Sequence, residues 1–310
     1  MANNAAWDTT TTVPAERDAQ AVSLNVAARA AVVAGPNWPA EFDGVPVVFD
    51  GFESGTLSSP AINDVGFSWS ETSSEIVTMD NGPLLIYRDG LVVSERPTDM
   101  TKSWQARSGN NAMLMNYPAG QNWVEQRFST ANPGMLGMWI AWDLRVPDNY
   151  YHNPQASASD ENQKLLRLWT DAYSGSDGAS KVGLSFRPLR DDGSSYYFGK
   201  IFGPATNGGD KGNVEFINVP RDLGKWMRLV VRVQFESSVG ANDGSMTVWR
   251  KWEDQTDFTK DYDWQNQGIR TSNDADITGF AAGYLLGYAN SAYTEDTDFL
   301  IDNFEIASLT

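Results

Sequence analysis

From about residue 45 to the C-terminus, short runs of β-branched, aromatic and aliphatic residues alternate with turn-forming residues. Turn signals such as Asp80-Asn81-Gly82, Asp191-Asp192-Gly193 and Asn242-Asp243-Gly244 separate these runs. No stretch in this region repeats its apolar residues with a helical period. The pattern therefore predicts an all-β fold, specifically a two-sheet antiparallel jelly-roll β-sandwich rather than a succession of βαβ units.

The runs predict strands at residues 45–50, 75–79, 83–87, 112–116, 122–129, 135–146, 163–171, 181–187, 195–202, 213–218, 226–236, 245–252, 279–289 and 298–307. The clearest hairpin spans 226–252, where Met227, Leu229 and Val231 alternate with more polar residues before a turn at 240–244. We expect one face of this hairpin in the core and the other face polar.

Residues 1–42 differ from the rest because they are rich in Ala and Thr, and we place a domain boundary near 40–44, giving an arm at 1–42 and a sandwich at 43–310. A helix is expected within 12–34, with Pro14 in its first turn and Gly35-Pro36 ending it. Its apolar face consists of small residues: Ala15, Ala19, Val22, Val26, Ala30 and Val33. Two interpretations are open, packing on the sandwich or docking on a neighbouring subunit. Such a face buries little area, and we predict that 1–42 contacts another protein chain.

The composition excludes several classes of protein. The 310 residues include 40 acidic and 23 basic side chains, for a formal charge of −17, which disfavours binding to nucleic acid. Cysteine is absent, so disulfides, zinc-cysteine sites and a cysteine nucleophile are excluded. The single histidine, His152, follows two tyrosines in an expected loop and is interpreted as structural.

No apolar run approaches the roughly 18 residues of a membrane span. No basic residue precedes Arg17, and Arg29 interrupts the best apolar stretch, so a secretory signal is not recognised within this chain. A cleaved secretory signal upstream of residue 1 is an open alternative. The expected location is extracellular or on the surface of a virion.

Several motifs resemble concanavalin A-like jelly rolls, including carbohydrate-binding modules and polysaccharide lyases. They are Phe52-Glu53-Ser54-Gly55 followed by Phe67-Ser68-Trp69, Gly224-Lys225-Trp226 leading into 243–249, and the closing strand 298–306. The resemblance covers roughly residues 45–308. It concerns the fold, and it says little about activity.

The closing strand carries an acid in an unexpected place. By the strand period of two, Asp302 shares a face with Leu300, Phe304 and Ile306, and a buried carboxylate needs a partner. An arginine, a hydrogen-bond cluster or a cation would serve. In the carbohydrate-binding jelly rolls that this chain resembles, equivalent acids bind a structural Ca²⁺. The resemblance thus implies a calcium site at Glu53 and Asp302, with Asp50 nearby.

Several strands carry aromatic side chains beside charged ones, an arrangement that suits sugar rings because they have an apolar face and a rim of hydroxyls. Strand 135–146, which carries Trp139, Asp143 and Arg145 on one face, is expected to contribute as well. Some of the tryptophans must belong to the core instead. The candidate carbohydrate-binding residues are Trp123, Glu125, Arg127, Arg167, Trp169, Tyr284 and Tyr288.

Two functions compete. Trp123-Val-Glu-Gln-Arg127 and the segment 283–288 resemble strands of alginate-lyase-like enzymes, which implies Arg127 or Arg167 as the uronate neutraliser and Tyr284 or Tyr288 as acid and base. The strand expected to supply a histidine, 164–169, has none. A glucanase is less favoured because its Glu-x-Asp-x-x-Glu strand is absent. We therefore favour a non-catalytic glycan-contacting sandwich of a larger assembly such as a phage virion, and keep a polysaccharide lyase as the alternative.

Overall fold

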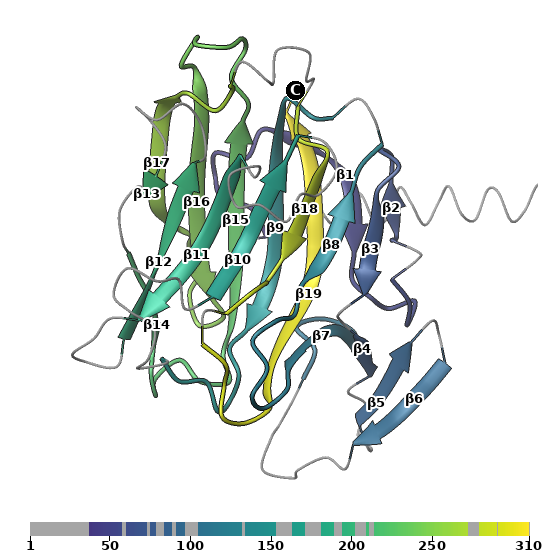
Figure 1. The fold of residues 1–310 in the computed structure, drawn as a ribbon. Coiled ribbons are helices and arrows are strands. Elements are labelled where there is room, and N and C mark those ends of the chain that lie inside the picture. Colours follow the sequence, from purple (N-terminus) through teal and green to yellow (C-terminus); the bar gives the residue numbers. More distant parts are fainter. Residues whose placement is uncertain are drawn as a thin grey trace, which may run out of the picture.

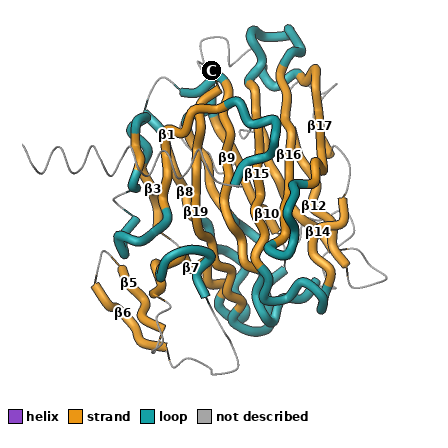
Figure 2. The backbone as a smooth tube through the Cα atoms, turned by 180° about the vertical axis from the view of Figure 1, so that it is seen from behind, coloured by secondary structure: helices purple, strands orange, loops and turns teal. Residues whose placement is uncertain are grey.

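The computed structural model describes residues 37–57, 60–72, 75–78, 84–88, 91–96, 105–131, 134–152, 163–170, 181–188, 194–201, 209–210, 214–271, 279–289 and 291–309. Two antiparallel sheets lie face to face in this part of the chain, and Figure 2 shows that strands and loops make up all of it. The all-β sandwich expected from the sequence is confirmed. The helix expected within 12–34 lies outside the described residues.

The eight-stranded sheet, here the front sheet, faces the viewer in Figure 1 and has the order β13-β12-β11-β10-β18-β8-β3, with β14 paired to β12. Its strands are β3 (Ser68–Thr72), β8 (Gln126–Ser129), β10 (Gln163–Trp169), β11 (Val182–Pro188), β12 (Ser194–Ile201), β13 (Gly209–Asp210), β14 (Val214–Asn218) and β18 (Ala282–Leu285).

The eleven-stranded back sheet has the order β17-β16-β15-β9-β19-β7-β4-β5-β6, and β1 pairs with both β19 and β2. Its strands are β1 (Gly44–Asp50), β2 (Ile62–Asn63), β4 (Glu75–Thr78), β5 (Leu84–Arg88), β6 (Leu91–Arg96), β7 (Asn111–Tyr117), β9 (Gly137–Arg145), β15 (Trp226–Gln234), β16 (Gly244–Trp252), β17 (Thr259–Gln267) and β19 (Thr297–Leu309).

The core lies between the sheets and follows from the alternation of side chains along the strands. Leu166, Leu168 and Leu285 of the front sheet meet Val231, Ile301 and Ile306 of the back sheet, and all six are fully buried. The expected hairpin 226–252 forms β15 and β16, joined by the predicted turn. Because strand 135–146 forms β9 of the back sheet, the expectation that it shares a face with the glycan candidates is wrong.

A bulge in β19 changes the expected placement of Asp302. Asp302 pairs with Asp143, yet Glu305 pairs with Ala141, and Asn303 between them has φ 48°. The extra residue reverses the alternation, so Phe304 and Ile306 enter the core, whereas Asp302 lies on the outer face of the back sheet. Asp302 is buried, as predicted, although on the opposite face from the one that the period of two indicated.

A cluster of aromatic side chains lies on the same outer face of the back sheet as Asp302. Residues 37–42 cross the back sheet as a strap, and Trp38 stacks on Phe42 with ring centroids 4.2 Å apart. Trp139 of β9 stacks on Trp249 of β16 at 5.0 Å, edge-on to both strap rings. The last residues of the segment assigned to the arm thus pack on the sandwich.

Candidate functional site

Three of the predicted site residues form one row across the front sheet. Arg167 of β10 is the register partner of Tyr284 of β18, which is in turn the partner of Arg127 of β8. Directly paired residues of neighbouring strands point to the same face, here the face away from the core. The structure therefore brings together the arginines and one of the tyrosines that the lyase hypothesis requires.

Arg167 and Tyr284 are closed off within this row. Arg167 is 1% exposed, and its guanidinium donates to the carbonyl oxygens of Leu166 (3.0 Å) and Leu184 (2.9 Å) and to Ser185 Oγ (2.8 Å). Tyr284 is 3% exposed and packs against the equally buried Trp169, with ring centroids 5.3 Å apart. A uronate ring does not reach these groups in this conformation.

Arg127 is held by a neighbouring acid. Its Nη2 lies 2.5 Å from Glu125 Oε1, and the two side chains are 15% and 4% exposed. Strand β8 begins at Gln126, so Glu125 precedes it rather than lying within the strand expected over 122–129. The buried ion pair leaves Arg127 partly accessible beside the aromatic residues described next.

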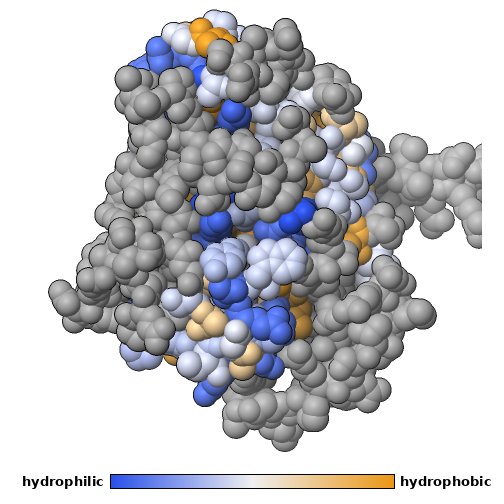
Figure 3. All heavy atoms as spheres, viewed as in Figure 1, coloured by the Kyte–Doolittle hydropathy of each residue, from blue (hydrophilic) through white to orange (hydrophobic). Residues whose placement is uncertain are grey.

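Trp123 and Tyr288 are the open part of the site. Their side chains are 47% and 41% exposed. Among the large apolar side chains that are strongly exposed in the described residues, these two are the aromatic ones. Their segments run side by side, since Ala289 N donates to Asn122 O at 2.8 Å. Lys164 Nζ lies 6.0 Å from the centre of the Tyr288 ring. Figure 3, viewed toward the front sheet, shows hydrophilic side chains gathered around ring side chains at the centre of this surface.

Tyr117, which sequence reasoning did not single out, ties these two segments together. Its side chain is fully buried at the end of β7, and its hydroxyl donates to Gly287 O at 2.6 Å and lies 3.4 Å from Val124 O. The same hydroxyl accepts from Gly287 N and from the amide nitrogen of Gln163. Gly287 and Val124 each adjoin one of the exposed aromatics, so Tyr117 fixes the distance between them.

Glu53 and Asp302 hold one turn on the other side of the molecule. Glu53 Oε1 accepts from Asn110 N (3.1 Å) and Asn111 N (3.0 Å), and Asp302 Oδ2 accepts from Ser108 N (2.9 Å). Burial raises the pKa of Asp302 to about 8, and the negative charges of Asp143 and Glu53 act in the same direction. The two acids are therefore gathered at the turn over residues 108–111.

Asp50 takes a separate place. Its carboxylate accepts from Phe52 N (2.8 Å) and Trp69 Nε1 (2.8 Å), and it pairs in register with Phe304, on the core side of the back sheet. The bulge in β19 puts Asp302 on the opposite side, so these two acids do not share a site. Within the described ranges, no group of three or more Asp, Glu or His side chains is arranged to hold a metal ion.

His152 makes hydrogen-bond contacts of 3.3 Å with Tyr150 Oη and 3.2 Å with Ile217 O, away from the row of Arg167 and Tyr284. The part of the chain that the structure describes contains no helix that could span a lipid bilayer.

No protein-family model and no curated protein matches the chain. Among solved structures it is similar to the alginate lyase vAL-1 from Chlorella virus, with 11% identity, a TM-score of 0.38, and coverage of 78% of this chain and 93% of that one. It is also similar to the VIP36 exoplasmic/lumenal domain in its Ca²⁺/Man2-bound form, with 11% identity, a TM-score of 0.41, and coverage of 64% of this chain and 76% of that one. A third similar structure is an engineered GH43 glycoside hydrolase, with 10% identity, a TM-score of 0.42, and coverage of 86% of this chain and 41% of that one.

Proposed function

We propose that the chain is a non-catalytic glycan-contacting sandwich, and that Trp123 and Tyr288 are its main contacts. The observation that supports this is their exposure, 47% and 41%, on two segments held side by side by Tyr117. Exposed aromatic planes next to the Glu125–Arg127 pair offer an apolar surface for a sugar ring and charged partners for its hydroxyls.

Glycan-array binding followed by titration of the best glycan tests this proposal. We expect Trp123→Ala and Tyr288→Ala each to weaken binding about 10-fold or more, the loss of roughly 1.4 kcal/mol of stacking. Val239→Ala is the matched control, because Val239 is 45% exposed in the β15–β16 turn of the other sheet. Binding that survives both aromatic substitutions would contradict the proposal.

The second candidate function, a uronate-specific polysaccharide lyase, is favoured by the row of Arg167, Tyr284 and Arg127. The buried guanidinium of Arg167 and the buried ring of Tyr284 speak against it. We expect no unsaturated-uronate absorbance on alginate, glucuronan or heparin-like substrates. If the wild-type chain produces this absorbance and Arg127→Ala does not, the chain is a lyase and the proposal of a non-catalytic binding protein is wrong.

We also propose a structural Ca²⁺ at Glu53 and Asp302, without Asp50. Two acids gathered at one turn, one of them buried near a third carboxylate, favour a cation there, although their bonds to backbone N–H groups already satisfy part of both carboxylates. A chelator is expected to lower the Tm of the wild-type chain and to leave Asp302→Asn unchanged. An equal Tm with and without chelator means that the backbone N–H groups alone hold these acids.

For the larger context, we propose an extracellular or virion-surface location and an assembly contact through residues 1–42. The support is the small-residue helix face expected within 12–34, which is marginal in isolation. Because Trp38 and Phe42 pack on Trp139, the informative deletion is 1–36. We expect that deletion to leave a folded sandwich that no longer assembles, and unchanged assembly would contradict the proposal.

A further inference from the structure

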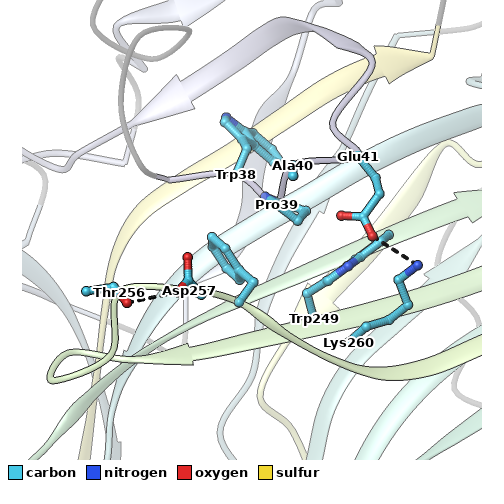
Figure 4. Close-up of a pocket in the computed structure, with 9 residues that line it drawn as sticks. Trp38, Pro39, Ala40, Glu41, Trp249, Thr256, Asp257 and Lys260 are labelled. Carbon is cyan, nitrogen blue, oxygen red and sulfur yellow. Dashed lines mark hydrogen bonds and ion pairs between the residues drawn. The ribbon is translucent and has the colours of Figure 1, made fainter.

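A pocket of about 360 Å³ lies on the outer face of the back sheet, on the opposite side of the sandwich from Trp123 and Tyr288. The strap, with Trp38 and Glu41, forms one wall, and the loop between β16 and β17, with Asp257 and Phe258, forms the other. Figure 4 shows Glu41, Trp249 and Lys260 together at one end and Thr256 and Asp257 at the other. The volume lies at the low end of the roughly 300–1,000 Å³ of ligand pockets, which suits a single ring.

The floor of the pocket is aromatic, but its ring faces are already covered. Trp249 stacks on Trp139 at 5.0 Å, and Lys260, its register partner on β17, lies 5.5 Å from the Trp249 centroid. Trp38 stacks on Phe42. A ligand therefore meets mostly ring edges, which carry partial positive charge and attract oxygen atoms rather than cations.

The rim of the pocket offers acceptors. Glu41 Oε1 lies 3.0 Å from Lys260 Nζ, and these side chains are 51% and 38% exposed. Lys260 lowers the pKa of Glu41, so this group is ionised at neutral pH. At the other end Thr256 Oγ1 donates to Asp257 Oδ2 at 2.9 Å and orients that carboxylate. Two oriented carboxylates across a small pocket accept hydrogen bonds from hydroxyl groups.

The charges of the pocket exclude other small ligands. Lys260 contacts both Glu41 and Asp263, at 3.0 and 3.8 Å, so its charge is already balanced and does not recruit a phosphate. A quaternary ammonium needs open ring faces, and here the ammonium groups of Lys260 and Lys251 lie over the rings of Trp249 and Phe258. What fits is a neutral ring with many hydroxyls.

We propose that this pocket binds a single neutral hexose unit of a glycan, as a second site independent of Trp123 and Tyr288. The hydroxyl protons bond Glu41 and Asp257, and the hydroxyl oxygens contact the edges of Trp38, Trp249 and Phe258. Sites on both faces of one sandwich let a single chain hold two glycan strands.

Saturation-transfer NMR of the full chain tests the second site with the methyl glycosides of mannose, glucose and galactose as probes. We expect Glu41→Gln and Asp257→Asn each to weaken binding of the responding glycoside about 10-fold, as expected for a hydrogen bond to a charged group. Phe258→Ala should abolish it. Asp254→Asn is the matched control, because it makes the same charge change in the same loop but lines a neighbouring cavity, and it should stay within 2-fold.

Trp123→Ala separates the two sites. Saturation transfer that persists in Trp123→Ala and is lost in Glu41→Gln supports the pocket, whatever the fate of the front-sheet proposal. Transfer lost in Trp123→Ala but unchanged in Glu41→Gln and Asp257→Asn overturns it. So does the absence of transfer to all three glycosides, or displacement of the sugar by inorganic phosphate or tetramethylammonium. Unchanged melting of Glu41→Gln and Asp257→Asn shows that a loss of binding is not a loss of folding.

Discussion

Removing one hydroxyl, in Tyr117→Phe, tests how the front-sheet site is held. The Tyr117 hydroxyl donates to Gly287 O at 2.6 Å and accepts from Gly287 N and the Gln163 amide, all in a fully buried setting. The phenyl ring keeps the packing but leaves these groups without their partner, at about 1–3 kcal/mol for each buried group that stays unsatisfied. The oxygen Oε1 of Gln163 keeps its bond from Tyr293 at 2.8 Å, so only the amide nitrogen of Gln163 loses its partner.

We therefore expect Tyr117→Phe to lower the free energy of unfolding by about 2–3 kcal/mol, measured by urea denaturation with tryptophan fluorescence. The Tm should fall by about 3–5 °C for a chain of this size. Tyr151→Phe is the matched control: its hydroxyl accepts from Thr294 N at 3.0 Å near the surface, where water replaces the bond, so less than about 1 kcal/mol is expected.

Equal destabilisation of the two variants, or a loss below about 0.5 kcal/mol for Tyr117→Phe, would refute this reasoning. The variant should also weaken glycan binding at temperatures where it is fully folded, because Gly287 and Val124 are the chain neighbours of Tyr288 and Trp123. Full stability loss with unchanged affinity would show that the tie does not position Trp123 and Tyr288.

Two further outcomes are expected. Burial raises the pKa of Glu305 to about 7 from an ordinary 4.5, despite Arg228 at 2.5 Å, so between these values the folded chain holds a proton that the unfolded chain has lost. The contribution of Glu305 to stability thus declines as the pH rises from about 4.5 to 7. Urea unfolding at several pH values should therefore show Glu305→Gln gaining stability relative to wild type over that range. A difference between the two proteins that does not change with pH would contradict this. Gly109→Ala, at a φ of 62°, would place a Cβ against the Glu53 carboxylate and should cost more than about 2 kcal/mol, about 1–2 of it from the backbone alone. Gly120→Ala, at a φ of 77° with open space around it, should show only the backbone part. Equal losses in the two variants would contradict the close approach of Glu53.

The sequence by itself determined the class of fold, because the side-chain period and the turn residues are local properties. Nearly every predicted strand is present within a few residues, including the hairpin of β15 and β16. Strand β17 escaped prediction because it is a polar edge strand with a single buried side chain, Tyr262, and so lacks the apolar alternation.

Only the tertiary structure decided which sheet each strand joins and which face each side chain takes. The strand order places β9 in the back sheet, behind the glycan candidates, although its sequence has the same pattern as theirs, with Trp139 beside the charged Asp143. One bulged residue, Asn303, moved Asp302 away from Asp50, and no local pattern marks such an insertion. Exposure likewise depends on segments distant in the chain, and this is why Trp123, in the segment before β8, is open whereas Trp169, at the end of β10, is buried.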